Sequence, residues 1–427
     1  MTGCVHRSIV LAALVFSADA EPPTSAPAED GAWTSLIQSN SLDGWVRRGG
    51  KAPFRIEDDV IIGQTVSDTS NSFLCTQRDF DDIELELEFM VDPGLNSGVQ
   101  IRSNCVPGYR GGVVHGYQVE IDPSERAWTG GIYDESRRGW LAPLDENPVA
   151  QRAFRPAAWN RLRIVARGNR IQTWINDVPA ADLTDGLTRT GFIGLQVHRT
   201  RATTPKEVRW RRIRVREFGK FCQQPPLNAI VLLAPSGDLS AWQHPDRPRD
   251  KIGWTFRDGV LEVTPGTGNI ETRRDFGDCR LHVEFCVTDN GRTGQANGNS
   301  GVFLQGRYEV QILNSVGQEP ADDTCGALYG AKAPDYNMSG PADQWQTYDV
   351  VFRAPRWSEN GRKNKLAVAT VYHNGTRIHD RVRIGGRTGS GRPEGSDDGP
   401  LVLQEHGNRV RFRNIWIAPL DGCKPKP

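Results

Sequence analysis

The sequence predicts an all-β protein made of two tandem antiparallel sandwiches. The strongest observation is a duplication, because Arg78-Asp79-Phe80 and the alternating strand that follows it return as Arg274-Asp275-Phe276 about 200 residues later. Solenoid repeats run roughly 20 to 50 residues, so a repeat of this size is a whole domain. Apolar and polar residues alternate in both halves, which is typical of strands with one buried face. Turn residues are frequent, and no convincing amphipathic helix is found.

The chain begins with a pattern typical of a secretory signal peptide over residues 1–20. His6-Arg7 precedes an apolar stretch from Ile9 to Phe16, and Ala18-Asp19-Ala20 supplies the small residues of a cleavage site. Residues 21–31 are rich in Pro, Ala and Glu, so we expect a disordered tether there. No later stretch is apolar enough to cross a membrane. The sequence therefore predicts a soluble protein that is secreted or periplasmic.

The first sandwich is predicted over residues 32–219. Period-two alternation marks strands at 84–89, 162–165, 171–175 and 208–211, and Asn176-Asp177 supplies a turn. The Arg-rich run from Arg209 to Arg216 could bind a polyanion or form the solvated face of a strand. Its period favours the strand face.

A linker is predicted over residues 220–229, where Pro225-Pro226 interrupts the pattern, and a second sandwich over residues 230–422. In this second half, Asn374-Gly375 between alternating residues is a strong hairpin signal.

Charge and cysteines limit the function classes. Lys and Arg total 52, as do Asp and Glu, so no global field would attract nucleic acid or an anionic membrane. Cys279 and Cys286 lie seven residues apart on one predicted strand, too far to bridge, and Cys279 takes the place of the core residue Ile83 of the first repeat. A disulfide between Cys222 and Cys423 remains open.

The repeated landmarks resemble those of the 3-keto-disaccharide hydrolase domain family, in two copies that cover almost all of the mature chain. The landmarks are, in order, the strands after Arg78 and Arg274, the turns Asn96–Val99 and Asn299–Val302, the strands Tyr117–Ile121 and Tyr308–Ile312, the segments Gly326–Tyr329 and Gln344–Arg356, the turn Leu403–His406 and the closing strand Val410–Ile415. The resemblance implies two concanavalin A-like jelly rolls, each with a concave sugar-binding face. It also implies action on glycosides that are already oxidised at C3.

The chemistry of such a substrate indicates which residues to seek. A ketone at C3 acidifies the proton on C2, and its removal leaves an enolate one bond from the glycosidic carbon. Loss of the C1 substituent by β-elimination, followed by addition of water, is net hydrolysis. This needs a base, an acid for the leaving oxygen, and an electrophile beside the ketone, which could be an arginine or a divalent metal ion.

Four residues are the candidates for catalysis. Alternation along the strand Tyr117–Ile121 of the first copy puts Gln118 and Glu120 on the same face. Along the strand Tyr308–Ile312 of the second copy it puts Glu309 and Gln311 on the corresponding face. We interpret Glu309 and Glu120 as candidate bases, because each is the only ionisable group on its patterned face; a structural hydrogen bond is the alternative. His406 and His198 recur at the same landmark and are candidates for the acid or a metal ligand. The second copy, which keeps Glu405 and Gly407, looks closer to the family pattern and is the expected catalytic copy.

Further residues are candidates for binding the substrate. Arg102 and Arg307 could hold the keto oxygen or a pair of hydroxyls, Trp140 and Tyr336 could stack on sugar rings, and Gln118, Gln311, Gln404 and Glu405 could bind hydroxyls. Asn96 and Asn299 are interpreted as residues that stabilise their own turns.

No dinucleotide or phosphate-binding pattern is found, so a separate oxidoreductase would have to supply the ketone. The alternatives are a carbohydrate-binding protein without activity, and a glycosidase that acts on unoxidised sugar with two carboxylates.

Overall fold

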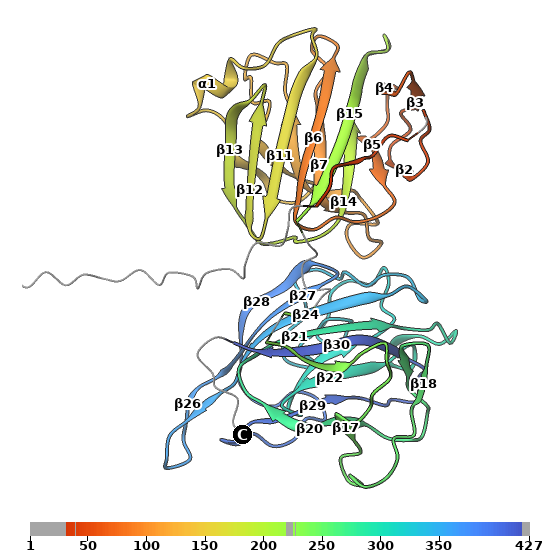
Figure 1. Cartoon of the computed structure of the whole chain (residues 1–427), viewed down its shortest axis with the longest axis vertical. Coiled ribbons are helices and arrows are strands. Elements are labelled where there is room, and N and C mark those ends of the chain that lie inside the picture. The colour runs from red at the N-terminus through yellow and green to blue at the C-terminus, as the bar shows by residue number, and fades with distance from the viewer. Residues whose placement is uncertain (1–30, 39, 219–224, 227, 421–427) are drawn as a thin grey trace, which may run out of the picture.

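The computed structural model describes residues 31–38, 40–218, 225–226 and 228–420, which form two β-sandwiches (Figure 1). The predicted signal peptide at residues 1–20, nearly all of the predicted tether at 21–31, most of the predicted linker, Cys222 and Cys423 lie outside the described residues.

The first sandwich packs two antiparallel sheets face to face. Its back sheet has the order β13-β12-β11-β6-β15-β4-β3, with β1 beside β15, and its groove sheet has the order β10-β9-β8-β7-β14-β5-β2. The strands are β1 (Thr34–Ser35), β2 (Trp45–Gly49), β3 (Phe54–Glu57), β4 (Val60–Gln64), β5 (Ser72–Thr76), β6 (Ile83–Val91), β7 (Ser97–Asn104), β8 (His115–Ile121), β9 (Ile132–Glu135), β10 (Gly139–Ala142), β11 (Asn160–Arg167), β12 (Arg170–Ile175), β13 (Val178–Thr184), β14 (Phe192–Val197) and β15 (Glu207–Glu217).

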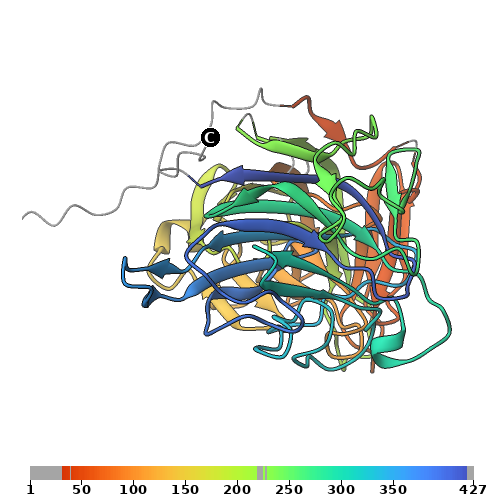
Figure 2. The same ribbon diagram turned by 90° about the horizontal axis from the view of Figure 1, so that it is seen from below.

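The second sandwich repeats this plan with fewer strands, and its layers are seen from below in Figure 2. Its back sheet has the order β18-β19-β30-β21-β24-β27-β28, with β16 beside β30, its groove sheet has the order β17-β20-β29-β22-β23, and β25 pairs with β26. The strands are β16 (Ile230–Leu233), β17 (Trp242–Gln243), β18 (Thr255–Arg257), β19 (Val260–Glu262), β20 (Ile270–Phe276), β21 (Cys279–Cys286), β22 (Ser300–Leu304), β23 (Tyr308–Ile312), β24 (Gln346–Arg353), β25 (Arg356–Trp357), β26 (Lys363–Lys365), β27 (Ala367–His373), β28 (Thr376–Ile384), β29 (Gly399–Leu403) and β30 (Arg411–Pro419).

The predicted fold class is confirmed, and each sandwich has its own apolar core. Leu85, Leu87 and Phe89 of β6 are fully buried, while the residues between them face outward, as the period-two pattern predicted. The described residues contain one short α-helix, α1 (Pro148–Gln151), and one turn of 3-10 helix at Gly294–Ala296. None of the described helices is long and apolar enough to span a membrane.

Both predicted hairpin turns are present. Asn176 and Asp177 join β12 to β13, and Asn374 and Gly375 join β27 to β28. All four residues have positive φ, between 49° and 73°, which matches the right-handed twist of the flanking strands.

The Arg-rich run is one side of an ion-pair ladder on the back sheet. Arg216, Arg214 and Arg211 of β15 pair with Glu84, Glu86 and Glu88 of β6 respectively. Ile213 and Val215, which lie between these arginines along the strand, are fully buried in the core. The interpretation as a strand face is therefore confirmed.

Cys279 is a core residue of the second sandwich, as predicted. The Cys286 thiol lies on the other face of β21, within 3.1 Å of the Arg411 guanidinium, so the two sulfurs cannot bridge.

Candidate active site

A groove of about 1050 Å³ lies on the outer face of the first sandwich's groove sheet. Tyr117, Val119 and Ile121 of β8 are buried in the core, so the residues between them, Gln118 and Glu120, face the groove. His198 and Trp140 line the same groove. The structure therefore brings together four of the predicted site residues, all from the first copy.

Three glutamines on neighbouring strands form a hydrogen-bonded ladder under this groove. Gln100 of β7 donates to Gln118 Oε1 at 2.6 Å, and Gln196 of β14 donates to the same oxygen at 2.8 Å. Gly98 makes this possible, because a Cβ at Gly98 would lie 2.5 Å from the Gln118 side chain. Since two amide groups donate to Gln118 Oε1, the Gln118 amide nitrogen must face the other way. It donates to Glu120 Oε2 at 2.7 Å.

Glu120 is thus a buried carboxylate that is held from both sides. Asn96 donates to its Oε1 at 2.6 Å, opposite the donation from Gln118, and the residue is 5% exposed. Burial raises the pKa of Glu120, while the two amide donors and Arg126 oppose that rise by favouring the charged form. The result is a fixed carboxylate with raised basicity at the floor of the groove. Asn96, interpreted from the sequence as a residue that stabilises its own turn, thus also holds the Glu120 carboxylate.

Replacing Asn96 with alanine should raise the pKa of Glu120 further, because the variant loses a hydrogen bond that favours the charged carboxylate, and such a bond is worth roughly 1.5–3 kcal/mol. The measurement is a carboxyl-carbon NMR titration of the Glu120 resonance. Asn71→Ala is the matched control, because Asn71 donates to Glu135 in the same groove at 3.3 Å. An unchanged Glu120 titration in the Asn96 variant would contradict this account of the site.

An aromatic and cationic wall stands beside Glu120. The Arg126 guanidinium lies over the rings of Trp128 and Trp140, at 4.8 and 4.9 Å from their centroids, and Trp140 contacts Tyr133 edge to face. Arg126 Nη2 lies 4.0 Å from Glu120 Oε1. Such a wall offers flat apolar faces for sugar rings and a cation for a developing negative charge.

His198 follows β14 at another edge of the groove. Its Nδ1 lies 2.9 Å from the carbonyl oxygen of Arg199, and a carbonyl can only accept, so Nδ1 carries the proton of the neutral ring. Burial lowers the pKa of His198, which leaves Nε2 as an acceptor at neutral pH. The backbones at His198 and Glu120 are separated by two strand spacings, roughly 10 Å, so the two side chains enter the groove from different strands.

Glu309 occupies a different environment in the second sandwich. Phe303 stands where Gln100 stands in the first copy, and the described residues around Glu309 include no cation acting on its carboxyl group. The segment 388–391 lies over the side chain, since a Cβ at Gly389 would be 2.5 Å from Glu309 Oε2. Glu309 is 3% exposed, and burial raises its pKa to about 8. It is neutral at pH 7 and almost closed off from solvent.

Of the other residues predicted for the site of the second copy, Gln311 is the one that reaches Glu309. The Gln311 amide, with its nitrogen toward them, is within 2.8 Å of Ser300 O and 3.3 Å of Glu309 Oε1. Gln404 Oε1 is buried without a partner, and Glu405 accepts from the amide of Gly407. His406 is exposed. These positions do not support the second copy as the catalytic one.

Both predicted arginines turn out to be structural, which corrects their assignment to the substrate. The Arg102 side chain is fully buried and donates to Asp81 O, to Gly168 O and to the Asp82 carboxylate. Arg307 donates to the carbonyl oxygens of Pro393 and Asp397 and so holds the segment that covers the second sheet. Period-two alternation predicted on which face of the sheet Arg102 and Arg307 lie, but it does not show which segments cover their side chains.

Tyr336 does not lie in a groove. Its ring packs at 5.7 Å from that of Tyr109, which belongs to the first sandwich. The predicted stacking of Tyr336 on sugar is therefore replaced by a contact between the two sandwiches.

Sequence reasoning missed Gln100, Gln196 and Arg126. A signal for the first two was present, because Val99-Gln100-Ile101, Tyr117-Gln118-Val119 and Leu195-Gln196-Val197 each place one glutamine between two core residues. Three such strands side by side predict a row of amides. Arg126 lies in a loop, and no pattern pointed to it.

Among the residues that the structure describes, no group of three or more His, Cys, Asp or Glu side chains is placed to hold a metal ion. Arg110, Arg126 and Arg199 line the groove and are candidates for the electrophile.

Comparison with known proteins agrees with the duplication. The model of the 3-keto-alpha-glucoside-1,2-lyase-like domain matches residues 32–216 and again 229–418. A crystal structure of a proposed glycosyl hydrolase from Parabacteroides distasonis is 35% identical over 46% of this chain and 85% of that chain, with a TM-score of 0.42. A second one from the same organism is 18% identical over 45% of this chain and 95% of that chain, with a TM-score of 0.35. No curated protein matches the chain.

Proposed function

The chain belongs to the family of the 3-keto-alpha-glucoside-1,2-lyase-like domain, and from that premise we propose that it cleaves 3-keto-glycosides in the groove of its first sandwich. Carbohydrate-related activity follows from the family. The observation that carries the finer proposal is the buried Glu120 carboxylate, whose two oxygens accept from Asn96 and Gln118 at the floor of a groove walled by aromatic rings.

Glu120 is the base in this proposal. It takes the proton from C2, and the electrons of the C2–H bond form the enolate whose oxygen is on C3. The Arg126 guanidinium, 4.0 Å from Glu120, is the group that stabilises this oxygen. No step is routed through a metal ion.

The enolate then expels the C1 substituent. The C1–O bond breaks, a C1=C2 double bond forms, and the C3 carbonyl is restored. Tyr133 is the proposed acid for the leaving oxygen, because it stands directly opposite Gln118 on β9 and burial raises its pKa, so its phenol keeps its proton at neutral pH. Water adds across the double bond, with hydroxide at C1 and a proton at C2, to complete net hydrolysis.

His198 is proposed to bind the leaving half of the substrate. Its neutral ring presents Nε2 as an acceptor for a sugar hydroxyl, and about 10 Å from Glu120 is a distance that a second sugar unit reaches. The groove volume, at the upper end of roughly 300–1000 Å³ for small-ligand sites, agrees with a substrate larger than one sugar.

The test compares a 3-keto-glucoside that carries deuterium at C2 with its unoxidised parent. We expect cleavage of the ketone alone, with deuterium released to water. Cleavage of the parent would instead favour a glycosidase, and binding without turnover would favour a carbohydrate-binding protein. Cleavage of the ketone with full retention of deuterium would contradict the elimination step.

Two further proposals concern the setting of the protein. The substrate ketone would come from a separate oxidoreductase that acts on C3 of the sugar. The pattern of residues 1–20 supports export from the cytoplasm, and N-terminal sequencing of exported protein tests this.

A further inference from the structure

We propose that the second sandwich is a brace that shapes the groove of the first, and that Gly375 and Tyr336 are positioning residues for the site. The inference depends on the proposed function only where kcat and KM are measured to test it. Two separate contacts carry it, and each ends on a wall of the groove.

The first contact is a short strand pairing between the sandwiches. The amide of Arg189 donates to Gly375 O at 2.8 Å, the amide of Arg377 donates to Leu187 O at 2.7 Å, and Thr188 forms a bridge with Thr376. Gly375 is packed tightly here, since a Cβ on it would lie 2.0 Å from Thr190 Cγ2. The turn that predicted a hairpin is thus also the docking point of the second sandwich.

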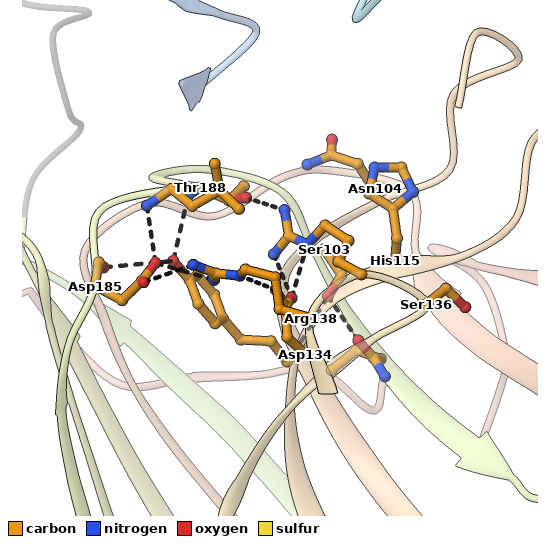
Figure 3. Close-up of polar contacts among 12 residues, drawn as sticks. Ser103, Asn104, His115, Asp134, Ser136, Arg138, Asp185 and Thr188 are labelled. Atoms are coloured by element: carbon orange, nitrogen blue, oxygen red, sulfur yellow. Dashed lines mark hydrogen bonds and ion pairs between the residues drawn. The ribbon is translucent and has the colours of Figure 1, made fainter. Parts of the chain in front are cut away.

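A buried polar cluster connects this pairing to β9. Thr188 accepts from Arg137 Nη1 at 2.6 Å, and its amide donates to the Tyr117 hydroxyl at 3.3 Å. Arg138 joins Asp185 to Asp134, and Asp134 is buried in β9 (Figure 3).

Asp134 stands between two residues of the groove wall, Tyr133 and Glu135. The Arg137 side chain, which donates to Thr188, is buried and pairs with Asp134 at 2.7 Å. The position of the 187–190 segment therefore affects where this wall stands.

The second contact reaches the 105–114 loop, which lies beside the end of β9 because Tyr109 and Arg110 both donate to Ser136 O. Tyr336 packs against Tyr109, and a Cβ on Gly108 would lie 2.6 Å from Asn337 O. Val106 packs against the core of the second sandwich. Val106, Gly108 and Tyr109 belong to the 105–114 loop, and residues 110–114 of this loop line the groove.

The second sandwich is suited to such a role because the part of its groove sheet around Glu309 is covered. Thr388 and Arg392 form backbone hydrogen bonds to Arg307 and Gly306, which holds their segment over the sheet beside Glu309. The second sandwich contacts the walls of the first sandwich's groove at two places. Its effect on the reaction is therefore exerted through that groove.

Gly375→Ala tests the brace, and Gly361→Ala is its matched control. Both glycines are in turns of the second sandwich with similar positive φ, +73° and +78°, but a Cβ on Gly361 has nothing within 4 Å. Backbone strain is therefore common to both variants, and only Gly375→Ala disturbs the contact. Hydrogen exchange is measured at the amides of Arg189 and Arg377 and over residues 105–114, and kcat and KM are measured with the 3-keto-glucoside.

We expect exchange at these amides to be about tenfold faster in Gly375→Ala than in Gly361→Ala, with KM raised about fivefold and kcat changed less than about twofold. Tyr336→Ala should raise KM similarly while leaving exchange at Arg189 unchanged, since it removes only the second contact. Equal exchange and equal KM in the two glycine variants would overturn the brace. If the wild type shows no turnover, the proposed function fails, and the exchange comparison still decides the brace on its own.

Discussion

Replacing Glu120 with glutamine is expected to lower the rate of cleavage of a 3-keto-glucoside by about 10²–10⁴-fold, the usual contribution of a positioned base. Gln118 and Asn96 both donate to this carboxylate, at 2.7 and 2.6 Å. A glutamine in its place would turn its own amide nitrogen toward one of these donors. The variant therefore loses the base and also one hydrogen bond, which costs about 1–3 kcal/mol of stability.

The rate is measured at saturating substrate, with thermal unfolding to show that the fold is kept. Glu309→Gln is the matched control, because it makes the same chemical change at the neighbouring strand position of the other copy. We expect its rate to stay within about twofold of the wild type. If Glu309→Gln lost activity and Glu120→Gln kept it, the site would belong to the second sandwich.

Glu309 should instead control how the stability of the second sandwich depends on pH. Its pKa is raised by burial to about 8 in the folded protein, from an ordinary value of 4.5. The folded state therefore binds more protons than the unfolded state between these pH values. Stability from the neutral carboxyl group is fully present below about pH 4.5 and is lost as the pH rises to about 8, by on the order of 4–5 kcal/mol.

Glu309→Gln should remove this loss, because an amide does not titrate. We expect the free energy of unfolding of the variant, relative to wild type, to rise by several kcal/mol between pH 5 and pH 9. Urea unfolding at both pH values measures it, and Glu319→Gln, at an exposed position of the same sandwich, is the control. A relative stability that stays the same at both pH values would mean that the Glu309 carboxyl group is solvated or paired.

The two glutamates show why position on a strand does not determine chemistry. Both lie on outward-facing positions of corresponding strands, and the sequence pattern treated them alike. Gln100 and Gly98 let an amide reach Glu120, whereas Phe303 stands at the position that corresponds to Gln100 in the copy that holds Glu309. Hydrogen bonds to Glu120 favour its charged form, whereas burial without such donors favours the neutral form of Glu309.

The sequence by itself determined the duplicated all-β architecture, the strand faces and both hairpin turns. These follow from period-two alternation and from residues that tolerate positive φ, and each depends on a few neighbours along the chain. It also determined that Gln118 and Glu120 share an outward face, whereas the structure showed that His198 and Trp140 line the same groove.

Only the tertiary structure decided which copy has an open groove. The segment near Gly389 covers Glu309, the buried ion pair of Arg102 removes it from the substrate, and Tyr336 belongs to the contact with Tyr109. Each outcome depends on a loop, or on a strand of the other sandwich, that lies far away in the sequence. Burial and charge pairing arise from those distant partners, and local periodicity carries no information about them.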